Sequence, residues 1–182
     1  MKFEEYEQIF ITDLPSFYKI KLYNEIAKFQ KIFVIFTYEN EMSRNEDFLN
    51  YPKKFDYINL PTGNVLFKSI FLIRTLMNMR YKQLVIGGWN TLVDWIAAFL
   101  FPKDKNAIVI ESTYYDSKTT GFKGVIKKLF LTRISTAYAS GILHKKLLQL
   151  LSFNKNIIIT KGVGLYNIVP QPPYRPDRKS VV

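Results

Sequence analysis

Cysteine is absent from the sequence, and histidine occurs once, at His144. A chain without cysteine has no disulfide framework, no thiol nucleophile and no thiolate metal ligands. With a single histidine, the sequence also argues against a histidine-rich metal site and against a Ser-His-Asp triad. We therefore expect no metal site, and we interpret His144 as a solvated helix residue.

Acidic residues are scarce and long apolar runs are missing. Asp and Glu total 15 against 26 Lys and Arg, which gives a formal net charge of +11. This balance favours polyanionic neighbours, namely nucleic acid, phosphorylated substrates or an anionic membrane surface. No nucleic-acid motif accompanies the charge, so we expect no nucleic-acid partner. The longest apolar stretch, "LVDWIAAFLF", is about half of a membrane span and contains Asp94. The acidic start "MKFEEYEQIF" is not a signal peptide. We expect a cytoplasmic protein that contacts the inner face of the membrane peripherally.

Hydrophobic residues make up 48% of the 182 residues and aromatic residues 16%, which is enough for one domain with a real core. Apolar runs typical of buried strands alternate with segments of helical spacing. The pattern predicts an α/β fold of the Rossmann-like, three-layer α/β/α class, with a parallel sheet of about seven strands. The expected strands are 8–12, 31–37, 56–61, 83–88, 106–111, 136–140 and 156–160. Helices are expected from Pro15 and Ser16 onward, over 66–80, 92–100, 122–130 and 143–152, with a polar loop at 38–55.

Four prolines in the ten residues "PQPPYRPDRK" predict an extended linker or tail. We therefore expect one domain over 1–169 and a linker over 170–182.

Parallel doubly wound sheets bind ligands outside the carboxyl ends of their strands. The loops that follow the strands therefore predict a cleft for an acceptor or sugar. Its predicted residues are Pro15, Ser16, Phe17, Tyr18, Gly87, Gly88, Trp89, Glu111, Ser112, Thr113, Gly162 and Gly164.

Two of these residues leave an alternative open. Trp89 is either a flat face for a sugar or a core tryptophan. Glu111, a carboxylate at the end of a central strand, is either a site residue or the partner of an ion pair.

Two nucleotide motifs are incomplete in this chain. The stretch "IESTYYDSKTTG" ends in Lys-Thr-Thr-Gly, but both glycines of a phosphate loop are missing before its lysine, where Ser117 precedes Lys118. The stretch "GVG" at 162–164 begins a dinucleotide fingerprint, but Asn167 occupies the position of its last glycine. We expect no cofactor in this chain.

Three lysines lie beside apolar residues on the helix expected at 122–130. Lys123, Lys127 and Lys128 are interleaved with Phe122 and Phe130. Such lysines form either a solvated face or a contact with an anionic membrane or with the pyrophosphate of a lipid-linked acceptor.

Four stretches carry a family resemblance. They are "TDLPSFYKIKLYNEIAKFQKIFVIF", "GGWNTLVDWIAAFLFPKDKNAIVIEST", "SKTTGFKGVIKKLFLTRIS" and "IIITKGVGLYNIVPQPPY", in that order. Together they resemble the amino-terminal half of bacterial GT-B glycosyltransferases of the family 4 type, which make capsule, lipopolysaccharide O-antigen and related glycans. The resemblance covers nearly the whole chain, and its most specific parts are "LPSFYKIKLYNEIAK" and "ESTYYDSKTTGFKG".

The resemblance implies a division of labour between two Rossmann-like domains. The first domain binds the acceptor, often a lipid-linked glycan, and the second binds the nucleotide-sugar donor. This sequence matches the first half, so we expect the donor-binding domain to be missing and the chain alone to transfer no sugar. Glu111 stands near a position where the family often has a histidine that faces the transferred sugar.

The alternative function is a stand-alone α/β binding or receiver-like module without catalytic activity. A receiver would need paired acids after its first strand and a phosphoacceptor Asp after its third. Asp13 is a lone acid after the first strand, and no Asp ends the strand expected at 56–61.

Overall fold

The computed structural model describes residues 5–37 and 51–161. Strands and helices alternate along these residues. In chain order they are β1 (Glu5–Thr12), α1 (Phe17–Ala27), β2 (Ile32–Phe36), β3 (Asp56–Asn59), α2 (Val65–Met77), β4 (Arg80–Ile86), α3 (Leu92–Leu100), β5 (Asn106–Ile110), α4 (Gly121–Thr132), β6 (Thr136–Ala139), α5 (Ile142–Leu150) and β7 (Asn156–Ile159). The predicted strands and helices are thereby confirmed.

The seven strands form one parallel sheet with the order β3-β2-β1-β4-β5-β6-β7. Ile11 at the carboxyl end of β1 pairs with Ile35 of β2 on one side and with Ile86 of β4 on the other. The order in which strands are added to the sheet reverses between β1 and β4, because β2 and β3 lie on one side of β1 and β4 to β7 lie on the other. This is the topological switch point at which doubly wound sheets bind ligands.

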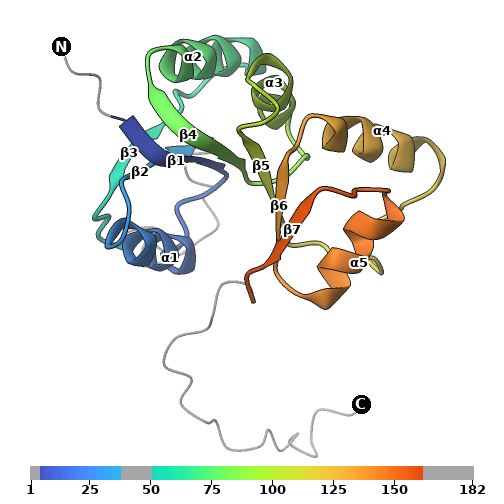
Figure 1. Cartoon of the computed structure of the whole chain (residues 1–182). Coiled ribbons are helices and arrows are strands. Elements are labelled where there is room, and N and C mark those ends of the chain that lie inside the picture. The colour runs from blue at the N-terminus through green and yellow to red at the C-terminus, as the bar shows by residue number, and fades with distance from the viewer. Residues whose placement is uncertain (1–4, 38–50, 162–182) are drawn as a thin grey trace, which may run out of the picture.

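Helices cover both faces of the sheet and complete the three layers. Figure 1 shows α1 on one face, α2 and α3 on the opposite face, and α4 and α5 near β6 and β7. One buried cluster joins α1, through Tyr23, to Phe10, Val34 and Phe36 of the sheet. A larger cluster joins the sheet to α2, α3, α4 and α5. The predicted Rossmann-like α/β fold is therefore what the structure shows.

The largest boundary differences, three residues each, are at the starts of β1 and β4 and at the end of α2, and all of them reflect pairing between β1 and β4. The strand expected at 8–12 begins at Glu5, because Glu5 and Tyr6 pair with Arg80 and Tyr81. The helix expected to run to Arg80 ends at Met77 for the same reason, since Arg80 already belongs to β4.

At the amino ends of the strands, polar side chains tie the helices to the sheet. Asn106 is fully buried and donates its amide to the carbonyls of Ala98 and Arg133, at 2.9 and 3.1 Å. The guanidinium of Arg133 donates to the carbonyls of Phe99 and Phe101. These bonds satisfy carbonyls at the end of α3, which have no partner within the helix. The amino ends of the strands are therefore held to the helices by hydrogen bonds, and the loops that line the candidate site follow the carboxyl ends.

Some predictions lie outside the described residues. These are Gly162 and Gly164, the linker at 170–182 with the domain boundary before it, and the larger part of the loop at 38–55. Among the described helices, none has the length and apolar character needed to cross a bilayer.

Candidate functional site

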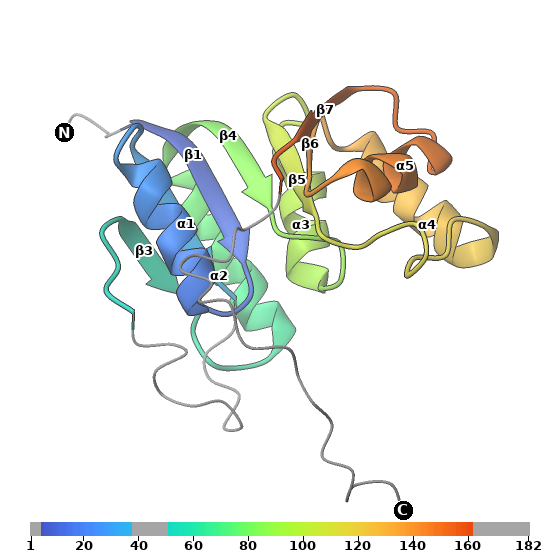
Figure 2. The same ribbon diagram turned by 90° about the horizontal axis from the view of Figure 1, so that it is seen from below.

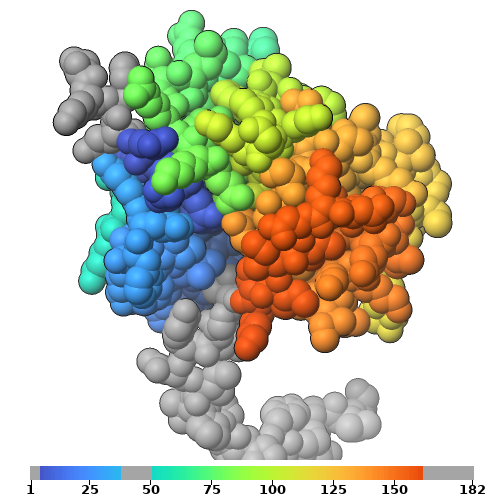
Figure 3. All heavy atoms as spheres, viewed as in Figure 1, coloured from blue at the N-terminus to red at the C-terminus, as the bar shows by residue number. Residues whose placement is uncertain are grey.

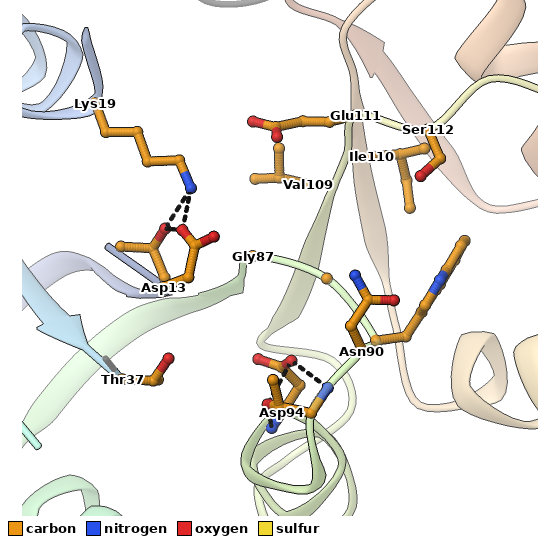
Figure 4. Close-up of a pocket in the computed structure, with 14 residues that line it drawn as sticks. Asp13, Lys19, Thr37, Gly87, Asn90, Asp94, Val109, Ile110, Glu111 and Ser112 are labelled. Carbon is orange, nitrogen blue, oxygen red and sulfur yellow. Dashed lines mark hydrogen bonds and ion pairs between the residues drawn. The ribbon is translucent and has the colours of Figure 1, made fainter. Parts of the chain in front are cut away.

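A pocket of about 190 Å³ opens at the switch point, where the carboxyl ends of β1, β4 and β5 meet (Figure 4). Five of the predicted site residues line it, namely Gly87, Gly88, Trp89, Glu111 and Ser112. Its other walls come from Thr12, Asp13, Lys19, Thr37, Asn90, Thr91, Asp94, Val109 and Ile110. The lining combines one aromatic ring with hydroxyl, amide and carboxylate groups.

Five other predicted residues do not line this pocket: Pro15, Ser16, Phe17, Tyr18 and Thr113. Pro15 and Ser16 form the turn into α1 at the same edge of the sheet, where the hydroxyl of Ser16 is buried. Thr113 donates to the Asp116 carboxylate at 2.6 Å, within its own loop. The β1 side of the pocket is formed instead by Thr12 and Asp13, directly after the strand, and by Lys19 of α1.

Lys19 is the buried cation of the pocket. Its ammonium forms a salt bridge with Asp13 and donates to the hydroxyl of Thr12 at 3.1 Å, with 13% of the side chain exposed. Burial by itself would raise the pKa of Asp13, but the hydrogen bond and positive charge of Lys19 outweigh it and lower this pKa below its usual value. Asp13 is therefore ionised at neutral pH, and the pair forms a fixed polar wall.

Glu111 lies across the pocket from that pair. Figure 4 shows its carboxylate directed toward Lys19 from the end of β5. The residue is exposed, and in the part of the chain that the structure describes no basic side chain forms a salt bridge with it. The sequence left Glu111 as either a site residue or the partner of an ion pair. In the structure it lines the pocket and has no ion-pair partner among the described residues.

The backbone of Glu111 is held by His144. The imidazole Nε2 lies 3.0 Å from the Glu111 carbonyl oxygen and donates a hydrogen bond to it. Nδ1 is buried and has no hydrogen-bond partner in the structure. His144 is a partly exposed residue of α5, and its side chain also joins the start of this helix to the end of β5.

Trp89 both packs on the core and lines the pocket. Its ring meets Phe130 edge to face at 6.4 Å, and its carbonyl accepts a hydrogen bond from the Trp95 indole at 3.0 Å. The Lys127 ammonium lies 5.6 Å from the ring centroid. Trp89 is thus packed against the core and also lines the pocket.

Lys127 is half-buried and lies against the pocket wall. It donates to the hydroxyl of Ser117 and, at 3.0 Å, to the carbonyl of Lys118. Burial lowers its pKa, as does the charge of Lys123. Of the three lysines grouped by the sequence, Lys123 and Lys128 are exposed on α4, whereas Lys127 fixes the loop between β5 and α4. That loop is thus held by side chains from α4.

The two glycines after β4 have different tasks. A Cβ on Gly87 would lie 2.8 Å from the Ile11 carbonyl oxygen, which also accepts the Gly87 N–H at 2.8 Å. A Cβ on Gly88 would approach only the Asn90 side chain, at 3.9 Å. Gly87 is therefore required by the close approach of β1 and β4, while Gly88 leaves open space in the pocket.

A buried carboxylate closes the floor of the pocket. Asp94 and Thr91 form a capping box at the start of α3, in which the Thr91 hydroxyl donates to Asp94 Oδ2 at 2.7 Å and accepts from the Asp94 N–H at 3.2 Å. Burial raises the pKa of Asp94 to about 6, against the opposing hydrogen bonds of Thr91 and with help from the negative charge of Asp13. The sequence signal was Thr-x-x-Asp at the start of an apolar helical stretch.

A second hollow of about 210 Å³ adjoins the first on the α1 side of the sheet. The two share Thr12, Lys19, Gly87, Val109 and Glu111. The additional lining is mostly apolar and comes from α1 and from the face of the sheet, with Leu22, Tyr23, Ile26 and Tyr138 among its members. Each hollow alone is smaller than the roughly 300–1,000 Å³ of typical small-molecule sites, and joined they reach that range.

The pocket lining offers several hydrogen-bonding groups and one aromatic face. Thr12, Thr37 and Asn90 supply neutral donors and acceptors, Glu111 supplies an exposed acceptor, and Trp89 supplies a flat apolar face.

Comparisons of the chain with protein-family models, with curated proteins and with solved structures found no match.

Proposed function

We propose that this chain is the acceptor-binding half of a glycosyltransferase of bacterial surface-polysaccharide biosynthesis. The complete enzyme would transfer a sugar from a nucleotide-sugar donor to a lipid-linked glycan acceptor. The observation that carries the proposal is the pocket at the switch point, with an aromatic wall at Trp89 and a polar lining opposite it. The resemblance of the sequence to the family 4 type supports the same function.

In this proposal Trp89 stacks on the apolar face of an acceptor sugar, and Glu111 accepts a hydrogen bond from one of its hydroxyls. The salt bridge between Lys19 and Asp13 forms the facing wall, where Lys19 can donate to a sugar oxygen. The nucleotide-sugar donor would bind to a second α/β domain that faces this pocket. Transfer therefore requires that domain, whereas acceptor binding can be measured on this chain.

The test is direct binding of saccharides. We would titrate the 182-residue chain with a panel of monosaccharides and oligosaccharides of bacterial surface glycans, following tryptophan fluorescence and saturation-transfer NMR. Trp89→Ala and Glu111→Gln should each weaken binding by about tenfold, because an aromatic contact or a hydrogen bond to a charged group contributes about 1.5 kcal/mol. Glu25→Gln, an exposed acid of α1 away from the pocket, is the matched control and should bind as the wild type does.

Two results would overturn the proposal. One is the absence of binding to every saccharide of the panel. The other is saccharide binding that Trp89→Ala and Glu111→Gln leave unchanged, which would place the sugar elsewhere on the chain.

A further inference from the structure

The outward sides of α2, α3 and α4 form a surface that we call the outer helical face. Large apolar side chains are exposed along it, from 38% at Phe71 to 79% at Phe122. Scattered exposed apolar residues are ordinary on a soluble domain, but a contiguous apolar surface marks an interaction site. The side chains that the argument uses are Leu66, Phe67, Ile70, Leu92, Leu100 and Phe122.

The three helices are packed next to one another. Helices α2 and α3 are in contact, and α3 meets α4 where Trp95 packs on Phe130 at a ring distance of 5.0 Å. The guanidinium of Arg133, directly after α4, donates to the carbonyl of Phe99 at 3.1 Å. Figure 3 shows the atoms of α2 and α3, green to yellow-green, side by side along the top of the molecule. Figure 2 shows the same helices from below.

Charge on these helices has one sign. They carry the basic residues Lys68, Arg74, Lys123, Lys127 and Lys128 and a single acid, Asp94. Asp94 is buried in its capping box, and Lys127 is turned toward Trp89. The cations exposed on the helices include Arg74, Lys123 and Lys128. The outer helical face is thus apolar and basic and has no exposed carboxylate.

We propose that the outer helical face binds an anionic lipid surface, with its apolar side chains in the interface and Arg74, Lys123 and Lys128 on the lipid phosphates. Apolar side chains with a basic rim are the combination that binds such surfaces. A second copy of the chain fits less well. A symmetric dimer would set this face against itself, with cations opposite cations and no exposed acid to pair with them. The inference does not depend on the proposed function, because binding to lipid requires no sugar.

The test is sedimentation of the chain with vesicles of phosphatidylcholine, with and without phosphatidylglycerol. The wild type should bind the anionic vesicles and be released at about 1 M salt, where the Debye length is about 3 Å. The triple variant Arg74→Gln, Lys123→Gln, Lys128→Gln should bind roughly a hundredfold more weakly, because each basic residue near the surface changes partitioning about fivefold.

A matched control removes the same charge elsewhere. Lys28→Gln, Lys54→Gln, Lys82→Gln changes three exposed lysines outside the outer helical face and should bind at least tenfold more tightly than the first triple variant.

An apolar variant tests the other half of the proposal. Leu66→Gln, Ile70→Gln, Leu100→Gln keeps helix propensity and net charge, and it should lower the binding at both low and high salt. Circular dichroism and thermal unfolding check that each variant is folded. A measurement without any variant is quenching of tryptophan fluorescence by brominated lipid, since Trp95 stacks on the exposed Phe99 of α3.

Three outcomes would overturn the proposal. The first is equal binding of the wild type to neutral and anionic vesicles at low salt. The second is equal binding to anionic vesicles by the triple variant of the outer helical face and by the control triple variant with Lys28, Lys54 and Lys82 changed. The third is a dimer in solution that the apolar variant converts to a monomer while vesicle binding is unchanged, which would assign this face to self-association.

Discussion

Replacing Asp94 by Asn should change how stability depends on pH. The carboxyl of Asp94 is buried and has a pKa of about 6, against 3.8 for an unperturbed Asp. The folded protein therefore binds this proton more tightly than the unfolded chain does. Stabilisation by the bound proton is complete below about pH 3.8 and is lost as the pH rises to about 6. Asn has no proton to lose, and its amide oxygen can still accept from the Thr91 hydroxyl and N–H.

The magnitude follows from the shift. About two pKa units at about 1.4 kcal/mol each correspond to about 3 kcal/mol. Between about pH 4 and pH 7, the wild type should therefore lose about 3 kcal/mol of unfolding free energy relative to Asp94→Asn. At about pH 4 the two proteins should differ by less than about 1 kcal/mol, because the folded Asp94 carboxyl is then protonated and is as neutral as the Asn amide that replaces it.

Urea unfolding at intervals between about pH 4 and pH 7 measures this difference. Asp104→Asn is the control, because Asp104 is an exposed acid in the turn before β5, and its difference from the wild type should stay constant. A constant difference for Asp94→Asn across the same range would refute the reasoning. The Asp94 carboxyl would then titrate alike in the folded and unfolded chains, and burial would not control it.

Three further perturbations have expected outcomes. Gly87→Ala should destabilise the protein by about 1–3 kcal/mol in urea unfolding, because its Cβ would meet a β1 carbonyl at 2.8 Å. Gly88→Ala should change the stability by less than about 0.5 kcal/mol. Equal effects of the two substitutions would show that the close approach of β1 and β4 does not require glycine at position 87. Gly124→Ala should lower the unfolding free energy by more than about 2 kcal/mol, because its Cβ would lie 2.2 Å from a carbonyl oxygen of the preceding loop. A gain in stability, as helix propensity alone would give, would show that the backbone of this loop can move to make room for the Cβ. Lys19→Gln should raise the pKa of Asp13 in an NMR titration and remove about 1 kcal/mol or less of stability above about pH 4. The wild type loses this stability as the pH falls through the lowered pKa of Asp13. An unchanged Asp13 titration would show that Lys19 does not control this pKa.

The sheet and its helices could be predicted because local pattern decides them. Apolar runs such as 32–36 are buried on both sides, as strands of a covered parallel sheet are. Some ends of strands and helices depend instead on pairing between strands that are distant in the sequence, which local pattern does not reveal. The ends of β1 and α2 differ from the prediction because Glu5 pairs with Arg80, a residue 75 positions away.

The pocket was predicted in part, for a similar reason. The strand-end rule found Gly87 and Glu111, since both directly follow a strand. It missed Lys19, because a lysine one turn into a helix has the same sequence pattern as a solvated one. It also missed Asp94, although the capping-box spacing was visible, and His144, because no local pattern relates it to a carbonyl 33 positions away.

Helix α4 has an outer side and an inner side that belong to one rigid element. Its outer side exposes Phe122 and Lys128, while its inner side holds Trp89 and the loop at Ser117 through Lys127. A partner that binds the outer side and shifts the helix also alters the shape of the pocket. Thermodynamic linkage then requires that a pocket ligand change the affinity of the outer side by the same factor. Saccharide and vesicle titrations on this chain should therefore each be carried out with and without the other ligand, and the ratio of the affinities gives the coupling free energy.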